Sequence, residues 1–466
     1  MSIFSDIKSN TVLKHFEMLS QIPRGSFNTK GIADFLCEFA ISNNLKHYRD
    51  SSDNVVIYKD GTKSGEPVIL QGHTDIVCDS ENDFDFQNSS IKLIRNEDIV
   101  TADGTTLGAD NGIACAMMMA ILTDTSLVHP PVECVFTSNE EVGLLGAAAL
   151  DCSKLKGKYL LNIDSAHEGV FTVGCAGGIS VIATKSCSTS KNTADTYKLS
   201  VSALDGGHSG AEIHKNRCNA IKLAAKIIDE IGNCNIISVT GGSKENAIPS
   251  GCEIVFTANS IDKTVAEKYI QYVKSTYSDS DCKIQILDMP VSEHAFTAAD
   301  SSNIINVLVG LPDGIKCMNK VIPDMVQTSS NIGVVTTADN NIKFEISVRS
   351  SVSHEKYQLQ KSIADILEKY NFDVDVHGDY PAWEFKEQSA LKDIAVETYA
   401  EMYGKQPVIR VIHAGLECGL FSDKIQNLDC ISYGPDLFDI HTTSERMSIS
   451  SVLRVYDFTL QLLKLI

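Results

Sequence analysis

The sequence is poor in positive charge. Its 466 residues include 40 lysines and arginines against 60 aspartates and glutamates, which gives a formal net charge of −20. No dense basic run interrupts this acidic average. Nucleic acids and anionic membrane surfaces both repel an acidic protein, so we expect neither as a partner.

Long hydrophobic runs and closely paired cysteines are also missing. The longest apolar helical stretch, residues 112–122, is too short to cross a bilayer. The first ten residues lack the basic start and the apolar core of a secretory signal. The 14 cysteines are scattered without a C-x-x-C pair, in a chain large enough to fold without disulfides. We therefore expect reduced thiols and a cytoplasmic protein.

The chain is longer than one hydrophobic core usually organises, so we expect at least two domains. After residue 53, strand-like runs at 67–71, 132–138 and 159–163 alternate with helical segments such as 112–122. This alternation predicts an α/β fold in which buried strands form a sheet with helices on both faces.

The middle of the chain has a different pattern. A glycine-rich segment at 174–178 is followed by strand-then-helix passages with helices at 219–231 and 355–370, which indicates an α+β insert. A helix at 390–403 then resumes the first pattern. We predict a discontinuous first domain and an inserted second domain, with boundaries that give the segments 1–178, 179–381 and 382–466.

Candidate chemical residues appear where the predicted strands end. His73 and Asp75 follow the strand at 67–71 and lie two positions apart, so both face the same side of an extended chain. Asp110 directly precedes a predicted helix. Taken singly, the first pair is most often an ordinary hydrogen-bonded loop, and Asp110 or its neighbour Asn111 is most simply a helix N-cap.

Three further motifs resemble these in position. Glu140 and Glu141 follow the strand at 132–138, Asp164 ends another strand, and His441 follows a turn-like Gly-Pro sequence. Adjacent acids usually mark a solvated helix start. Here they lie between apolar segments, so at least one of the two carboxylates is expected to face a positive charge.

Together, these strand ends deliver histidine, aspartate and glutamate into one crevice, because ligands collect where the strands of an α/β sheet end. Buried carboxylates without partners are costly, so such a cluster needs cations for neutrality. Two divalent ions would supply them. Two imidazoles and three carboxylates, one of them bridging, suit Zn²⁺, with Co²⁺ or Mn²⁺ as alternatives.

In combination, the motifs resemble those of the M20 metallopeptidases and, within them, the aminoacyl-histidine dipeptidases. The resemblance covers nearly the whole chain, and its most specific parts are Leu107-Gly-Ala-Asp110 and Ser138-Asn-Glu-Glu-Val-Gly143. It implies a zinc-peptidase-like catalytic domain with a mixed sheet flanked by helices. It also implies that the α+β insert is a lid that binds substrate.

The resemblance further implies a role for each candidate in the first domain. The metal ligands would be His73 and Asp164 for one ion, Glu141 and His441 for the other, and Asp110 as the bridge. Glu140 would be the general acid and base, and Asp75 would assist catalysis from behind His73. A cis peptide bond after Asp110 is also implied.

Residues of the insert match the family as well. His208, in Gly206-Gly-His-Ser-Gly210, resembles a histidine that helps to hold the oxyanion, and Arg349 resembles an arginine that binds the substrate carboxylate. Gly415 lies in a loop that resembles the substrate-end loop of the dipeptidases, and Asn246 and Asn331 are weaker candidates for contacting substrate. Without the resemblance, a glycine turn, a surface ion pair and ordinary turns would explain His208, Arg349 and the two asparagines.

The function implied is dinuclear, metal-dependent hydrolysis of dipeptides, of the Xaa-His type and related unspecific ones, at a site completed when the lid closes. A homodimer through the lid domain is also implied. Two alternatives stay open on the same scaffold, an N-acyl amino acid deacylase and an aminopeptidase. A third, from another class, is a catalytically silent metal- or peptide-binding protein, although the intact Glu140 argues against it.

Overall fold

The computed structural model of the chain describes residues 3–7, 11–277, 281–322 and 324–466. The first ten residues, for which we predict no secretory signal, therefore lie partly outside the described residues. The chain divides into two compact units. The first unit comprises Met1–Gly174, Phe385–Val411 and Leu416–Ile466, and the second comprises Cys175–Glu384 and Ile412–Gly415.

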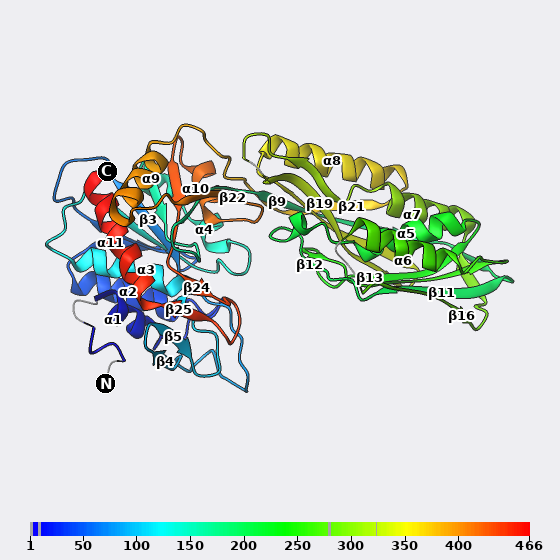
Figure 1. Cartoon of the computed structure of the whole chain (residues 1–466), viewed down its shortest axis with the longest axis horizontal. Helices are drawn as coiled ribbons and strands as arrows, with labels where there is room; N and C mark the ends of the chain where they lie inside the picture. Colours follow the sequence, from blue (N-terminus) through cyan, green and yellow to red (C-terminus); the bar gives the residue numbers. More distant parts are fainter. Residues whose placement is uncertain (1–2, 8–10, 278–280, 323) are drawn as a thin grey trace. The chain divides into compact units, whose positions relative to one another are not determined.

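The first unit is built on a mixed sheet of eight strands (Figure 1). In sheet order these are β1 (Lys46–Arg49), β2 (Val55–Lys59), β6 (Val132–Thr137), β3 (Val68–His73), β7 (Tyr159–Asn162), β23 (Asp429–Ser432), β8 (Val170–Cys175) and β22 (Val408–Ile412). The central strand β3 runs parallel to both of its neighbours, whereas β1, β2 and β6 pair antiparallel. The predicted α/β fold with a mixed sheet is thus confirmed.

Helices cover both faces of this sheet, as the alternation of side chains along β3 shows. Gln71 points toward a helix that begins at Glu417, while Gly72 faces α3, where an added Cβ would lie 2.4 Å from the side chain of Asn111. A side chain at position 72 would therefore prevent the close approach of α3. The helices of this unit are α1 (Thr11–Leu19), α2 (Lys30–Ser42), α3 (Ala109–Thr123), α4 (Leu145–Ala149), α9 (Ala390–Tyr403), α10 (Glu417–Lys424) and α11 (Ile449–Leu465), with a 3-10 turn at Cys152–Lys154.

Helix α3 is apolar on all sides and almost completely buried in the core of the first unit, as expected for a helix that packs between a sheet and other helices. It starts earlier than the sequence suggests, at Ala109, and its backbone is not helical at Asp110 and Asn111. The peptide bond between these two residues is cis, as the family resemblance implies. Gly108, rather than Asp110 or Asn111, is the N-cap residue.

A smaller sheet completes the first unit. It contains β24 (Leu437–Phe438), β25 (Arg446–Ser448), β5 (Ile99–Ala102) and β4 (Leu93–Asn96), in that order. His441 lies in the connection between β24 and β25, with a φ of +65° that non-glycine residues rarely adopt.

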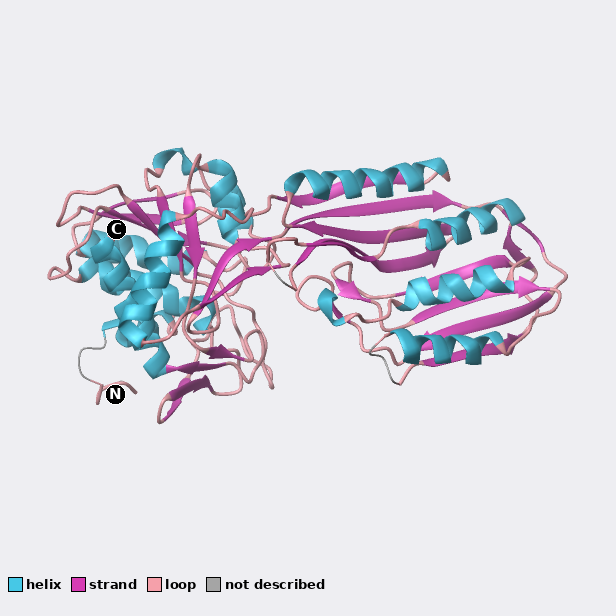
Figure 2. Cartoon of the chain, turned by 45° about the horizontal axis from the view of Figure 1, so that its top comes forward, coloured by secondary structure: helices cyan, strands magenta, loops and turns pink. Residues whose placement is uncertain are grey.

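The second unit is an antiparallel sheet with helices α5 to α8 along one face (Figure 2). In order, the sheet contains β16 (Lys283–Met289), β11 (Asp195–Ser202), β15 (Cys252–Ala258), β13 (Asn235–Gly241), β19 (Val326–Ala338), β20 (Asn341–Ser350), β9 (Gly177–Ser186) and β21 (Asp373–Tyr380), with β18 (Gly314–Met318) beside β19. Two small pairs join β10 (Thr189–Lys191) to β17 (His294–Phe296) and β12 (Gly207–His208) to β14 (Ala247–Ile248). The helices are α5 (Ala220–Ile231), α6 (Val265–Thr276), α7 (Ala298–Gly310) and α8 (Ser353–Lys369), with a 3-10 turn at Ile213–Lys215.

The second unit has a hydrophobic core of its own, formed by the inward side chains of these strands and helices. Helix α5 illustrates why the elements form here. The side chain of Asn219 accepts hydrogen bonds from the N–H groups of Ile221 and Lys222, which caps the helix, and its apolar face packs against β11 and β15.

Two further properties concern the whole described chain. The cysteines of the described residues form no disulfide. Among these residues, no helix is both long enough and apolar enough to span a lipid bilayer.

Candidate metal centre

His73, the last residue of β3, is buried and faces two carboxylates. Its Nε2 atom lies 3.2 Å from Oδ1 of Asp110 and 3.6 Å from Oδ1 of Asp164. Its Nδ1 atom lies 3.0 Å from the backbone carbonyl of Asp75, which only accepts hydrogen bonds, so Nδ1 carries the hydrogen. In the neutral ring, Nε2 then has a lone pair toward the carboxylates, as a metal ligand requires.

Asp110 lies between two imidazoles. Its second oxygen, Oδ2, is 3.3 Å from Nε2 of His441, which in turn is 3.0 Å from Oε1 of Glu141. Ligand atoms of His73, Asp110 and Glu141 all lie within 4.8 Å of one another. The structure therefore brings the five predicted ligands together, and each oxygen of Asp110 faces a different histidine, as a bridging carboxylate does.

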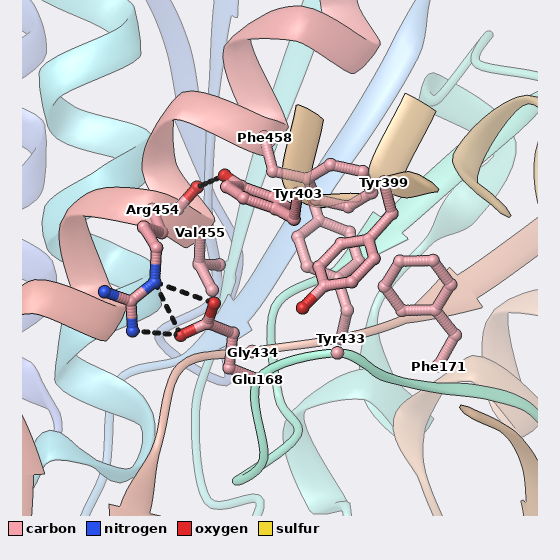
Figure 3. Close-up of a pocket in the computed structure, with 10 residues that line it drawn as sticks. Glu168, Phe171, Tyr399, Tyr403, Tyr433, Gly434, Arg454, Val455 and Phe458 are labelled. Carbon is pink, nitrogen blue, oxygen red and sulfur yellow. Dashed lines mark hydrogen bonds and ion pairs between the residues drawn. The ribbon is translucent and has the colours of Figure 1, made fainter. Parts of the chain in front are cut away.

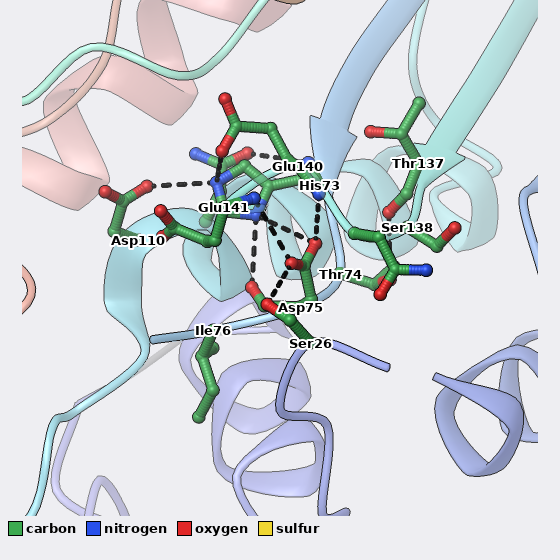
Figure 4. A network of polar contacts seen from close by, with 12 residues as sticks. Ser26, His73, Thr74, Asp75, Ile76, Asp110, Thr137, Ser138, Glu140 and Glu141 are labelled. Atoms are coloured by element: carbon green, nitrogen blue, oxygen red, sulfur yellow. Dashed lines mark hydrogen bonds and ion pairs between the residues drawn. The ribbon is translucent and has the colours of Figure 1, made fainter. Parts of the chain in front are cut away.

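The two predicted catalytic residues lie beside this cluster (Figure 4). Asp75 is fully buried, and its carboxylate accepts hydrogen bonds from the backbone N–H groups of Glu140 at 2.9 Å and Glu141 at 3.3 Å, and from the hydroxyl of Ser26 at 2.8 Å. Asp75 thus holds the segment that carries both glutamates. One carboxylate oxygen of Glu140 lies 3.9 Å from Nε2 of His73, so Glu140 borders the cluster from one side.

The protein groups of the cluster strongly perturb one another's pKa values. Burial raises the pKa of Asp164 to about 6 and that of Glu140 well above its usual range. The nearby carboxylates of Asp110 and Glu141 raise the pKa of His441 to about 10. Burial opposes protonation of His73, but Asp164 and Asp110 outweigh it and raise the pKa of that imidazole. Shifts of this size within one cluster are typical of functional sites.

The donor set fits divalent metal ions. It combines two imidazole nitrogens with carboxylate oxygens, the ligands that suit zinc and related ions. Oε1 of Glu141 is buried and accepts no hydrogen bond of acceptable geometry from the described residues, although it lies 3.0 Å from His441. Cations would neutralise the buried acids and would complete the coordination of this oxygen.

Three buried charged or titratable residues near the cluster were not singled out in the sequence. Arg24 and Glu445 contact the backbone of the turn that precedes Asp110. Glu417, the first residue of α10, is fully buried and accepts hydrogen bonds from the side chains of Gln71 and Thr137. Burial raises the pKa of Glu417 to about 8. Arg24 belongs to no motif whose spacing signals chemistry. Glu417 and Glu445 lie in the segments of Gly415 and His441, but only the tertiary contacts reveal what they bind.

The predicted substrate-binding residues lie in the second unit. Nδ1 of His208 accepts hydrogen bonds from the N–H groups of Gly210 and Ala211 at 3.1 and 2.9 Å, so the hydrogen of the neutral ring is on Nε2. Burial lowers the pKa of His208, and nearby Arg349 lowers it further. His208 therefore presents a neutral N–H donor. A side chain at Gly207, where φ is +125°, would collide with Arg217, so this turn requires glycine.

Arg349 is a partly buried cation of the second unit. Its Nη1 donates to the hydroxyl of Tyr380 at 2.8 Å, and its Nε is buried without a hydrogen bond. Among the described residues, no carboxylate oxygen lies within 4.0 Å of this guanidinium. The ordinary surface ion pair that the sequence alone would suggest is therefore absent from this part of the structure, and the guanidinium has donors left for an anionic ligand.

The loop that contains Gly415 carries a further histidine of the second unit. His413 is buried, and its Nε2 lies 2.7 Å from the hydroxyl of Ser329. Burial lowers the pKa of His413 to about 3, with a further contribution from Arg349. Gly415 itself is only partly buried. Like His208, His413 is a neutral ring beside a cation.

The two asparagines have different environments. Asn331 is buried, and its amide group donates to the backbone carbonyls of Glu245 and Ala247 at 3.0 and 2.8 Å. It thereby braces the segment that carries Asn246, whose side chain is exposed. Contact with substrate stays a prediction for both residues.

A small cavity elsewhere in the first unit is not part of the cluster. Aromatic side chains, among them Phe171, Tyr399 and Phe458, surround a space of about 10 Å³, with the ion pair of Glu168 and Arg454 at its edge (Figure 3). This volume is about that of one water molecule, so the cavity is too small for a peptide.

A mixed α/β sheet that ends in imidazoles and carboxylates defines a candidate metal-dependent hydrolase, and comparisons with known proteins agree with this class. The sequence model of Peptidase family M20/M25/M40 matches residues 69–465. The chain therefore belongs to this peptidase family and is a peptide hydrolase.

Two relatives with more than 30% identity match over nearly the full length of the chain. The cytosol non-specific dipeptidase of Escherichia coli (strain K12) is 32% identical over 481 residues, covering 100% of this chain and 99% of the relative. The crystal structure of aminoacylhistidine dipeptidase from Vibrio alginolyticus superimposes with a TM-score of 0.90 at 31% identity, covering 99% of this chain and 98% of that one. Aminopeptidase PepT from Bacillus cereus shares the fold at 16% identity and a TM-score of 0.59.

Proposed function

We propose that this chain is a dinuclear metallo-dipeptidase that hydrolyses dipeptides of the Xaa-His type and related unspecific dipeptides. The observation that carries the proposal is the position of Asp110, whose two oxygens lie 3.2 and 3.3 Å from the imidazoles of His73 and His441. The names of both full-length relatives support dipeptides as substrates.

Two divalent ions, zinc in our proposal and cobalt or manganese as alternatives, would be held by the ligand cluster. His73 and Asp164 would bind one ion, Glu141 and His441 the other, and Asp110 both. When bound, such ions polarise the scissile carbonyl and lower the pKa of an attacking water toward neutrality.

Glu140 is the proposed general acid and base. Its carboxylate borders the cluster but lies farther from a histidine than the carboxylates of the proposed ligands do. Asp75 accepts a hydrogen bond from its backbone N–H and so holds it in place. It would take the proton of the attacking water and then deliver it to the leaving amine. The raised pKa that burial gives Glu140 favours this exchange of a proton near neutral pH.

The second unit would bind the substrate. Arg349, which has no acidic partner and no hydrogen bond at its buried Nε among the described residues, would hold the free carboxylate and so restrict substrates to short peptides. His208 would donate its Nε2–H to the oxyanion, because its Nδ1 is occupied by two backbone N–H groups.

Metal content measured beside hydrolysis tests the whole proposal. The purified protein should contain about two equivalents of metal, hydrolyse a His-containing dipeptide, lose activity with a chelator and regain it with zinc. A parallel panel of an N-acetyl amino acid and a tripeptide separates the alternatives. Preferred hydrolysis of either compound would favour a deacylase or an aminopeptidase, and bound metal without turnover would indicate a silent binding protein.

The cellular location and the oligomeric state of the protein are further proposals. A cytoplasmic location is supported by the name of the E. coli relative, a cytosol non-specific dipeptidase, and fractionation of cells would test it. A homodimer through the second unit is supported by the position of β16 at an edge of its sheet, where backbone groups face no further strand of that sheet. The molecular mass in solution, by light scattering, would test it.

A further inference from the structure

The turn that carries Asp110 has no side-chain cap of its own. Gly108, its N-cap residue, has a φ of +68° and no side chain to accept hydrogen bonds. The four backbone N–H groups of residues 107–110 donate instead to the carboxylate of Glu445. Oε2 accepts from Leu107 and Gly108 at 2.8 and 2.9 Å, and Oε1 accepts from Ala109 and Asp110 at 2.9 and 3.2 Å.

The carbonyl side of the same turn is held by Arg24. Its Nη2 donates to the carbonyl of Gly108 at 2.6 Å, and its Nη1 donates to the carbonyl of Thr74 at 2.9 Å. Arg24 and Glu445 are each 2% exposed. The backbone that presents Asp110 is therefore held between two buried charged side chains that come from opposite ends of the sequence.

Each of these two residues connects Asp110 to a different half of the ligand cluster. Arg24 joins the turn to Thr74, the residue next to His73, whose Nε2 faces Oδ1 of Asp110. Glu445 belongs to the same segment as His441, whose Nε2 faces Oδ2 of Asp110. The distance from each imidazole to its carboxylate oxygen thus depends on a separate buried contact.

We propose that Arg24 and Glu445 are positioning residues that hold Asp110 as a bridge, Arg24 setting the His73 half of the metal centre and Glu445 the His441 half. The proposal rests on the dinuclear centre proposed above and deepens it. Groups that orient metal ligands commonly alter metal affinity about 10- to 100-fold when they are changed.

Buried charge is a costly means of holding a backbone turn. Burying a charge is costly unless an opposite charge pairs with it, and neutral side chains can also bind backbone groups. Among the described residues, Arg24 and Glu445 have no oppositely charged side-chain atom within 4.0 Å. Arg24 also leaves its Nε buried without a hydrogen bond. Charge-assisted hydrogen bonds are shorter and stronger than neutral ones, so these contacts hold the turn firmly and are suited to orienting a metal ligand.

The test is the zinc-binding isotherm of the full-length protein, measured by competition with a chromophoric chelator. In Glu445→Gln, one amide oxygen replaces two carboxylate oxygens, so about half of the turn's N–H groups lose their acceptor. We expect the affinity for one of the two zinc ions to fall by about 10- to 100-fold, while the affinity for the other ion changes little. Arg24→Lys, whose single amine cannot hold both carbonyls in the same way, should weaken the other equivalent.

Combination with ligand variants identifies which equivalent is affected. In a His441→Ala background, Arg24→Lys should still weaken the remaining zinc, whereas Glu445→Gln should add little. Glu133→Gln is a matched control, since Glu133 is also buried and accepts from the backbone N–H groups of Lys156 and Gly157, away from the cluster. It should lower thermal stability without changing zinc affinity. If Glu445→Gln does not fold, Glu445→Asp replaces it, with a smaller loss expected at the same equivalent.

The two proposals fail in different ways. A wild-type protein that binds fewer than two zinc equivalents would contradict the dinuclear centre itself. A second outcome is that the wild type binds two zinc ions tightly, but each variant loses affinity for both ions equally and in proportion to its loss of thermal stability. This outcome would show that Arg24 and Glu445 only support the fold. The inference would also be wrong if the wild type binds two zinc ions tightly and neither substitution changes the affinity for either ion.

Discussion

The candidate functional groups of the two units carry opposite charge. In the first unit, carboxylates outnumber the two imidazoles around Asp110, and their pKa values are shifted far from ordinary ones. In the second unit, Arg349 lies beside two neutral histidines, and no carboxylate oxygen of the described residues comes within 4.0 Å of it.

This difference indicates a division of labour. The first cluster suits cations, whereas the second suits an anionic group such as the carboxylate of a small peptide. Loss of function should therefore take a different form in each unit: lost chemistry or metal in the first, and lost substrate affinity in the second.

The largest effect should come from Glu140→Gln, which removes the proposed proton carrier and leaves the ligands intact. We expect turnover to fall by about 10²- to 10⁴-fold, while metal content stays at the wild-type value. Steady-state kinetics and elemental analysis of the same preparation measure both quantities. Glu168→Gln, at the distant aromatic cavity, serves as the control. Activity close to that of the wild type in Glu140→Gln would assign the proton transfer to another group.

His441→Ala should be the next most harmful change, and it should differ from Glu140→Gln in kind. His441 contacts both Asp110 and Glu141, so its loss should release one of two metal equivalents and lower turnover by about 10²-fold or more. Excess zinc should restore part of the activity. The exposed His167 of the same unit provides a control, since His167→Ala should keep both equivalents. Full metal content in His441→Ala would remove His441 from the ligand set.

A substitution in the second unit should act mainly on KM. Arg349→Lys keeps the charge but loses the fork that binds a carboxylate through two nitrogens, so KM for dipeptides should rise by about 10- to 100-fold with a smaller change in kcat. Tyr380→Phe, which removes one neighbour of the guanidinium, should have a weaker effect of the same kind.

Dipeptide amides make this prediction sharper. They lack the carboxylate that Arg349 is proposed to bind, so the wild type should hydrolyse them with a high KM. Arg349→Lys should not raise the KM for the amides further. An equal loss on both substrate types would show that Arg349 acts elsewhere in catalysis.

The sequence predicts those parts of the fold that depend on local pattern. The strands at β3, β6 and β7 were expected because short apolar runs end there in polar or glycine-rich segments, and the ligand candidates follow directly from those ends. The start of α3 was missed, because the backbone leaves the helical region at Asp110 and Asn111, which no periodicity reveals.

Long-range backbone contacts were the other part that could not be predicted. Glu445 binds N–H groups more than 330 positions away, and Arg24 binds the carbonyl of Gly108 across 84 positions. A buried charged side chain that binds backbone groups does not need an oppositely charged residue as its partner. The sequence therefore contains no matching residue that would indicate the contact. Asn331 also binds backbone carbonyls of its own unit, which its sequence does not indicate, and its contact with substrate stays a prediction.

The smallest expected effect concerns stability rather than catalysis, and it tests the cationic character of the second unit. Burial and the nearby Arg349 lower the pKa of His413 to about 3, below the value of about 6.5 expected in the unfolded chain. Between these values the unfolded chain binds a proton that the folded chain does not, so stability falls as the pH drops from about 6.5 toward 3.

His413→Gln removes this titration and keeps a polar group opposite Ser329. Between pH 7 and pH 5, the wild type should lose on the order of 2 kcal/mol more stability than the variant does. Urea unfolding at the two pH values, followed by circular dichroism, measures the difference. His294→Gln, at an exposed position of the same unit, should respond to pH as the wild type does. If His413→Gln lost as much stability as the wild type over this interval, His413 would titrate normally, and the second unit would not disfavour a further positive charge beside Arg349.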